Sequence, residues 1–200
     1  QVGMTLGYRP SRWARPRGEA KDFVGIAVAL HSCEGPELAR EIKALGVKQV
    51  LLRIPVWEID QIENYVSFIE SVPECEVAVC VMQSRGDVTD LDAWRLNLRK
   101  IVQSCWPRVR SFQIGQGANR SKWGFFSTAE YLKFASVAEE LREDFEGIEL
   151  IGPGILDFET MPLLRSLAHG FAINWDTVGC ALYVDRRGSP KNRQLLLFNV

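Results

Sequence analysis

The sequence has no long apolar segment, no excess of basic residues and no cysteine pairs at metal-binding spacing. Its longest apolar runs, Phe23–Leu30 and Gln194–Phe198 with their flanks, fall short of the ~18–20 residues that a membrane-spanning helix needs, so we expect no membrane partner. The 24 Lys and Arg are balanced by 25 Asp and Glu, which argues against nucleic acid as the main partner. The five cysteines are scattered without CxxC spacing. We therefore expect no metal site, and reduced, mostly buried thiols in a cytoplasmic protein.

The composition is that of an ordinary globular chain, with 46% hydrophobic residues and six tryptophans among 200 residues. The first 22 residues stand apart, because basic residues are interleaved there with proline, tyrosine and tryptophan and follow neither a helical nor a strand period. We expect residues 1–22 to be a basic leader that lies on the surface, with an arm for an acidic partner as the alternative. Residues 23–200 are then expected to form the folded domain.

From residue 23 onward, short apolar runs alternate with amphipathic stretches. The expected strands are Phe23–Leu30, Gln49–Val56, Glu76–Met82, Val109–Gly115, Ile148–Gly152 and Thr177–Tyr183. The expected helices are Pro36–Leu45, Glu58–Val72, Thr89–Cys105, Ser127–Phe145 and Glu159–Ala168, with a capping box of Thr89 and Asp92. The strands are continuously apolar, which is typical of strands buried on both faces. This alternation predicts a parallel sheet in sequential order, with one helix in each connection.

Two arrangements of such a sheet compete. A doubly wound sheet usually carries a glycine-rich phosphate loop after its first strand, but residues 31–36 read HSCEGP and match neither GxGxxG nor GxxxxGK[ST], so we expect no cofactor. Polar residues gather after the strands instead, as in TIM (β/α)8 barrels. The expected fold class is therefore α/β, a TIM-type barrel of which about six βα units are present. Six units leave two open edges, so we expect further chain beyond Val200, or an oligomeric partner, to cover them.

On this interpretation, the carboxyl ends of the strands form one rim, where barrels build their sites. Amide, guanidinium and aromatic groups suit a saccharide, and the rim residues expected to bind one are Arg53, Gln116, Asn119, Arg120, Trp123 and Tyr183. The candidate catalytic carboxylates are Asp157 and Asp185. His31 is either a general base or a structural histidine.

The segment around the fourth expected strand carries the most specific signal. Residues 111–124 read SFQIGQGANRSKWG and resemble the fourth-strand region of clan A glycoside hydrolases, where an Ile-Gly-Asn-Glu-Pro-Asn-like run precedes a Trp. The matching residues are Gln113, Ile114, Gly115, Asn119, Trp123, Tyr131, Gly152 and Pro153. Arg53 matches an Arg that is common at the end of the family's second strand. The family consists of retaining (β/α)8 enzymes, so the resemblance implies this fold and a sugar-shaped cleft.

The same segment departs from the family at the acid/base residue. Gln116-Gly117 stands where the family carries Asn-Glu, and a glycine cannot protonate a leaving group. A retaining enzyme needs two carboxyls ~5–5.5 Å apart, and in the family the second one ends a seventh strand that this sequence does not reach. We therefore expect a carbohydrate-binding, non-catalytic pseudo-glycosidase. The alternatives are an active glycosidase or transglycosidase with relocated carboxylates, and a barrel enzyme of another chemistry.

Overall fold

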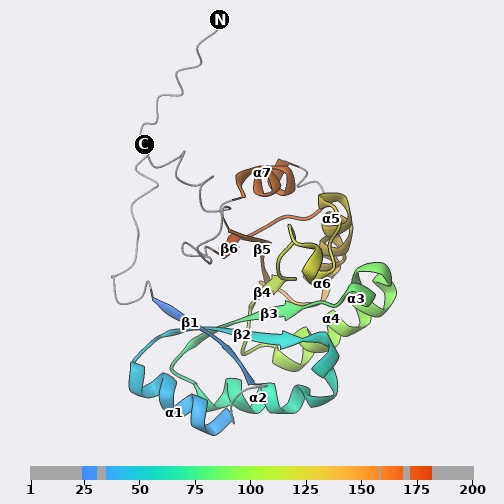
Figure 1. Cartoon of the computed structure of the whole chain (residues 1–200). Helices are drawn as coiled ribbons and strands as arrows, with labels where there is room; N and C mark the ends of the chain where they lie inside the picture. Colours follow the sequence, from blue (N-terminus) through green and yellow to red (C-terminus); the bar gives the residue numbers. More distant parts are fainter. Residues whose placement is uncertain (1–23, 31–34, 158, 169–171, 182–200) are drawn as a thin grey trace, which may run out of the picture.

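The computed structural model describes residues 24–30, 35–157, 159–168 and 172–181, and shows an α/β fold built on one six-stranded sheet (Figure 1). The strands are β1 (Gly25–Ala29), β2 (Gln49–Pro55), β3 (Glu76–Met82), β4 (Ser111–Ile114), β5 (Glu149–Leu156) and β6 (Thr177–Ala181). All neighbouring strands are parallel, and their order follows the sequence. The predicted parallel, sequential sheet is thereby confirmed. Within the described residues β1 and β6 are edge strands, so the sheet is a curled half-barrel.

The helices follow the convex side of the sheet (Figure 1). The α-helices are α1 (Gly35–Leu45), α2 (Ile62–Ser71), α3 (Arg85–Thr89), α4 (Leu91–Cys105), α5 (Thr128–Ser136), α6 (Leu141–Asp144) and α7 (Thr160–Ala168). Short 3₁₀ segments are η4 (Val56–Gln61), η5 (Ser121–Trp123) and η6 (Val137–Glu140). The long helix expected over residues 58–72 is therefore divided into the 3₁₀ segment η4 and the helix α2, and the one expected over 127–145 into α5, the 3₁₀ segment η6 and α6.

The predicted capping box of Thr89 and Asp92 is wrong. The capping box lies one turn earlier, where the Ser84 N–H donates to Asp87 Oδ2 at 2.7 Å and Ser84 Oγ accepts from the Asp87 N–H. Asp90 then starts α4 by accepting a hydrogen bond from the Ala93 N–H at 3.0 Å. Two competing caps six residues apart thus create two helices where the apolar period alone predicts one.

The two faces of the sheet differ because side chains alternate along each strand. Leu52, Val79 and Phe112 are fully buried under the helices, and each contributes about 1.5–3 kcal/mol through burial of its apolar surface. The intervening residues, such as Leu51 and Ala78, point to the concave side and remain partly exposed. At the amino ends of the strands, this side forms an open groove of about 540 Å³. The core therefore lies between sheet and helices, and the described residues leave the concave face open at the amino ends of the strands.

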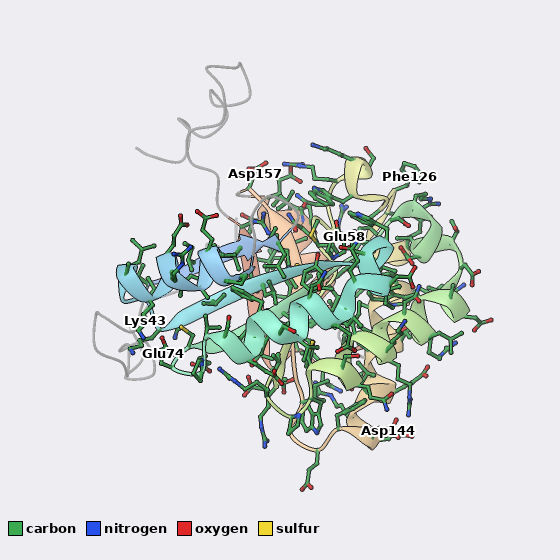
Figure 2. The ribbon with its side chains drawn as sticks, turned by 90° about the horizontal axis from the view of Figure 1, so that it is seen from below. Lys43, Glu58, Glu74, Phe126, Asp144 and Asp157 are labelled. Carbon is green, nitrogen blue, oxygen red and sulfur yellow. The ribbon has the colours of Figure 1, made fainter. Side chains whose placement is uncertain are left out.

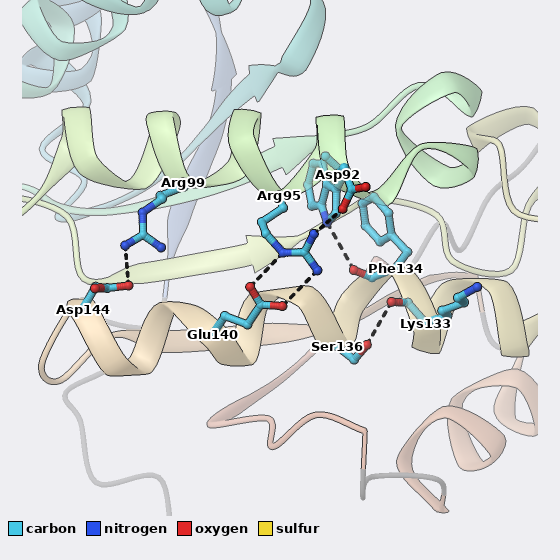
Figure 3. A network of polar contacts seen from close by, with 9 residues as sticks. Asp92, Arg95, Arg99, Lys133, Phe134, Ser136, Glu140 and Asp144 are labelled. Atoms are coloured by element: carbon cyan, nitrogen blue, oxygen red, sulfur yellow. Dashed lines mark hydrogen bonds and ion pairs between the residues drawn. The ribbon is translucent and has the colours of Figure 1, made fainter.

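Helix α4 packs along the segment formed by η6 and α6, as Figure 3 shows. Arg95 Nε donates to Glu140 Oε2 at 2.8 Å between them, but both side chains are more than a third exposed, so solvent screens this ion pair and it contributes little to stability. Beneath it, the Trp94 and Phe134 rings stack with centroids 4.0 Å apart. The Trp94 indole also donates to the Phe134 carbonyl at 3.1 Å. The buried aromatic pair, more than the ion pair, fixes how α4 and α5 pack.

Several predictions concern residues outside the described ranges. These are the basic leader 1–22, His31, Tyr183, Asp185 and the stretch that follows β6. Within the described ranges, no helix has the length and apolar content needed to cross a membrane.

Candidate functional site

The strands end together at one end of the half-barrel, opposite the loops through which the chain enters them. Figure 2 labels Glu58, Phe126 and Asp157 at the end where the strands finish, and Lys43 and Glu74 at the end where the strands begin. Because the strands are parallel, everything that directly follows them is gathered at this rim. The loops after β3, β4 and β5 therefore decide which groups the rim presents.

Gln83, directly after β3, holds the loop that follows β4. Its side chain is buried. Its Nε2 donates to the Gln116 carbonyl at 3.0 Å and to the Trp123 carbonyl at 2.7 Å, while its Oε1 accepts from the Gln116 N–H at 2.9 Å. Each of these bonds satisfies a group that would otherwise be buried without a partner. The positions of Gln116 and Trp123 are thus set by the end of β3.

The same loop brings Gly117 against the ring of Trp123. Gly117 has a φ of +65°, and a Cβ built on it would lie 2.3 Å from Trp123 Cδ1. Carbon atoms in normal contact are about 3.5–4.0 Å apart, so any side chain here would have to displace the indole. The positive φ also favours glycine for the backbone. The position at which the resemblance places an acid/base glutamate has no room for one in this loop.

Arg53, Cys80 and Gln113 lie side by side on the concave face, because they occupy paired positions on β2, β3 and β4. Gln113 Nε2 donates to Cys80 Sγ at 3.2 Å and to the Gly115 carbonyl at 3.0 Å. Cys80 Sγ in turn donates to Gln116 Oε1 at 4.0 Å. A guanidinium, a thiol and two amides are therefore neighbours below the rim, with the thiol of Cys80 and the amide of Gln116 buried.

The thiol of Cys80, between Arg53 and Gln113, is unreactive near neutral pH. Burial raises the pKa of its thiol to about 12, although the positive charge of Arg53 acts in the opposite direction. The thiolate is the reactive form of cysteine, so Cys80 remains a neutral hydrogen-bonding group near neutral pH.

A second polar cluster joins the β4 loop to the end of β5. The Asn119 side chain bonds both backbone groups of Leu156, with its Nδ2 donating to the carbonyl and its Oδ1 accepting from the N–H, each at 2.9 Å. Arg120 forms ion pairs with Asp157 and Glu159. Asn119 Nδ2 also donates to Glu159 Oε2 at 2.8 Å. These contacts hold two neighbouring loops together and occupy both carboxylates with one guanidinium.

The convex side contains a separate cavity of about 390 Å³ between α1 and α2. The Tyr65 hydroxyl donates to Glu58 Oε2 at its edge. Burial, and then the hydrogen bond and negative charge of Glu58, raise the pKa of Tyr65 well above its ordinary value of 10.0. Tyr65 therefore stays a neutral donor, and this cavity is distinct from the concave face.

The structure divides the predicted site residues into two groups. Arg53 and Gln116 border Cys80, and Trp123 adjoins Gln116 through Gly117. Asn119 and Arg120 belong to the cluster around Asp157. Sequence reasoning missed the partner role of Glu159, although its place directly after β5 was a usable signal. It also missed Cys80, whose inward position follows from counting alternate residues along β3.

Within the described residues, no group of His, Cys, Asp and Glu side chains could hold a metal ion. No protein-family model matches the chain, and no curated protein sequence matches it. The resemblance to clan A glycoside hydrolases is therefore wrong as an assignment of family. The half-barrel sheet and the short matching segment carry no evidence specific to that clan, and Gly117 and its indole neighbour replace the family's defining residue.

Proposed function

We propose that this chain forms a TIM-type half-barrel that binds a saccharide at the strand ends without hydrolysing it. One observation carries the proposal: a chain of contacts links Arg53 to Gln116 through Cys80, and Gln116 to Trp123 through Gly117, and the side chains of Arg53 and Trp123 are partly exposed. Guanidinium and amide groups bind sugar hydroxyls, and a partly exposed indole offers an apolar face for a pyranose ring. The described cysteines are free thiols, which supports a cytoplasmic setting for this binding.

The carboxylates of the described rim support binding more than hydrolysis. Asp157 and Glu159 both bind Arg120, and a glycosidase needs one free carboxylic acid and one free carboxylate facing the scissile bond. Gly117 offers no acid at the end of β4. General acid assistance is worth about 10²–10⁴ in rate, so alkyl glycosides with poor leaving groups should resist this protein.

The test is a titration of the whole chain with neutral oligosaccharides, followed by tryptophan fluorescence, beside a hydrolysis panel of aryl and alkyl glycosides. We expect saturable binding, no turnover of alkyl glycosides, and weaker binding with a smaller fluorescence change in Trp123→Phe. Trp106→Phe is the matched control, because Trp106 is also partly buried but packs on Phe145 beyond the C-terminus of α4. Binding unchanged in Trp123→Phe, or absent from the wild-type chain, would contradict the proposal.

A second candidate function is an active glycosidase that uses Asp157. The observation in its favour is the backbone of Asp157, whose φ of 63° is the one positive φ of a non-glycine residue within the described ranges. Such strain gathers at functional sites. Hydrolysis of alkyl glycosides by the wild-type chain and its loss in Asp157→Asn would establish this alternative in place of the binding function.

A further inference from the structure

We propose that the saccharide bound at this rim carries an anionic group, a carboxylate or a phosphate, and that Arg53 is the residue that binds it. This inference rests on the proposed function and narrows the class of ligand. It concerns Arg53, the one arginine that lies within a strand of the described sheet.

The position of Arg53 follows from strand alternation. Its neighbours Leu52 and Ile54 are fully buried on the helix side, so Arg53 points to the concave face. In the register of the sheet it lies between Ala29 on β1 and Cys80 on β3. Among the described residues, its neighbour on β1 has only the small methyl side chain of Ala29.

Arg53 differs from the other partly buried arginines in having no partner within the described part of the chain. Arg120 binds two carboxylates, and Arg142 binds Glu139 and Asp176. Arg53 is likewise half-buried, yet no hydrogen bond or ion pair to a described residue engages it. A charge that is partly removed from water and left unpaired costs stability. Groups of this kind persist where a ligand uses them.

Among the described residues, the neighbours of Arg53 across the sheet carry no negative charge. Cys80 stays a neutral thiol, and the Nε2 donor of Gln113 already serves Cys80 and Gly115. The neighbours Cys80 and Gln113 are thus uncharged, and no described residue accepts a hydrogen bond from the N–H groups of Arg53. A guanidinium presents its N–H groups as a planar fork that matches a carboxylate or phosphate through two parallel hydrogen bonds. A neutral hydroxyl uses this geometry less well.

The experiment compares charged and neutral members of matched ligand pairs by titration calorimetry with the whole chain. One arm uses an oligogalacturonate and its methyl ester, and the other uses a sugar phosphate and the same sugar without phosphate, so the arms distinguish a carboxylate from a phosphate. We expect the preferred charged ligand to bind about 10–100-fold more tightly than its neutral counterpart. Arg53→Gln should abolish this preference, and Arg53→Lys should retain part of it because the charge remains without the fork.

Arg40→Gln is the matched control, since it removes the same charge from an exposed position on α1. It should leave the preference unchanged. A second readout is thermal stability without ligand: Arg53→Gln should melt at the same or a higher temperature, because it removes an unpaired charge, whereas a purely structural arginine would lower the melting temperature when replaced. Lower stability of Arg53→Gln together with an unaltered ligand preference would overturn the inference.

The two proposals fail in different ways. Equal affinity for the charged and neutral members of both pairs would overturn the role of Arg53 and leave saccharide binding intact. Failure of every saccharide to bind would overturn the proposed function, and the role of Arg53 with it.

Discussion

Replacing Gly117 with alanine should lower the free energy of unfolding by roughly 2–5 kcal/mol, for two separable reasons. The first is the backbone: a non-glycine residue in the left-handed region costs about 1–2 kcal/mol. The second is steric, since the new Cβ would lie 2.3 Å from Cδ1 and 2.8 Å from Cγ of Trp123. Restoring normal contact requires the indole to move by about 1 Å, and overpacking of this kind costs about 1–3 kcal/mol.

Gly46 provides the control that separates the two reasons. It also has a positive φ, +67°, but a Cβ there would meet nothing within 4 Å. Gly46→Ala should therefore show the backbone cost alone, about 1–2 kcal/mol. The measurement is urea unfolding followed by circular dichroism, with the slopes compared to confirm that the unfolded states are equivalent.

A double-mutant cycle with Trp123→Ala completes the test. Without the indole, Gly117→Ala should lower the free energy of unfolding by less, and the difference should equal the steric cost of about 1–3 kcal/mol. If Gly117→Ala and Gly46→Ala destabilise the protein equally, and the cycle shows no coupling, then the indole does not lie against Gly117 and the account of this loop is wrong.

Three further predictions concern single groups. Gln83→Leu should cost roughly 3–6 kcal/mol in urea unfolding, because three hydrogen bonds to buried backbone groups are lost; a loss below about 1 kcal/mol would contradict the role given to Gln83. The hydrogen bond from Arg85 is the largest influence that lowers the pKa of Glu130 below its ordinary 4.5. Glu130→Gln should therefore destabilise the protein above about pH 4.5, and this deficit should vanish as the pH falls through the lowered pKa, whereas a pH-independent deficit would exclude the ion pair as its cause. In native protein, thiol reagents should modify the exposed Cys180 but modify Cys80 only on unfolding, as mass spectrometry of the labelled peptides would show; early labelling of Cys80 would refute its burial.

The sequence was sufficient to predict the strands because apolar residues dominate each of them, even where a polar residue such as Arg53 or Gln113 lies within the run. The strand expected over Glu76–Met82 has those bounds in the structure, and the sequential parallel order follows from connections that each hold a helix. Helix boundaries were harder to predict. Ser84 and Asp90 each begin a helix within a few residues of one another, and the apolar period does not reveal that two helices form here.

The site was predictable only in part, because its function depends on which side chains already form hydrogen bonds or ion pairs within the protein. Position after β4 placed Asn119 and Arg120 at the rim, but their partners come from the end of β5, nearly 40 residues away in the chain. No local sequence pattern indicates that Arg120 forms ion pairs with Asp157 and Glu159, or that Arg53 has no such partner among the described residues. The resemblance around residues 111–124 misled for a related reason: a short run of Gly, Gln and Asn fits any tight loop that leaves a buried strand.

The sequential order of the strands also has a kinetic consequence. Partners such as Gly25 and Gln49, or Ile151 and Thr177, belong to consecutive strands, so no pairing in the described sheet has to wait for a distant part of the chain. Such a topology has low contact order for a parallel sheet, and loop closure costs little at each step. Each βαβ unit can therefore dock on the previous one as it leaves the ribosome, and the sheet can grow in the direction of synthesis from β1 to β6.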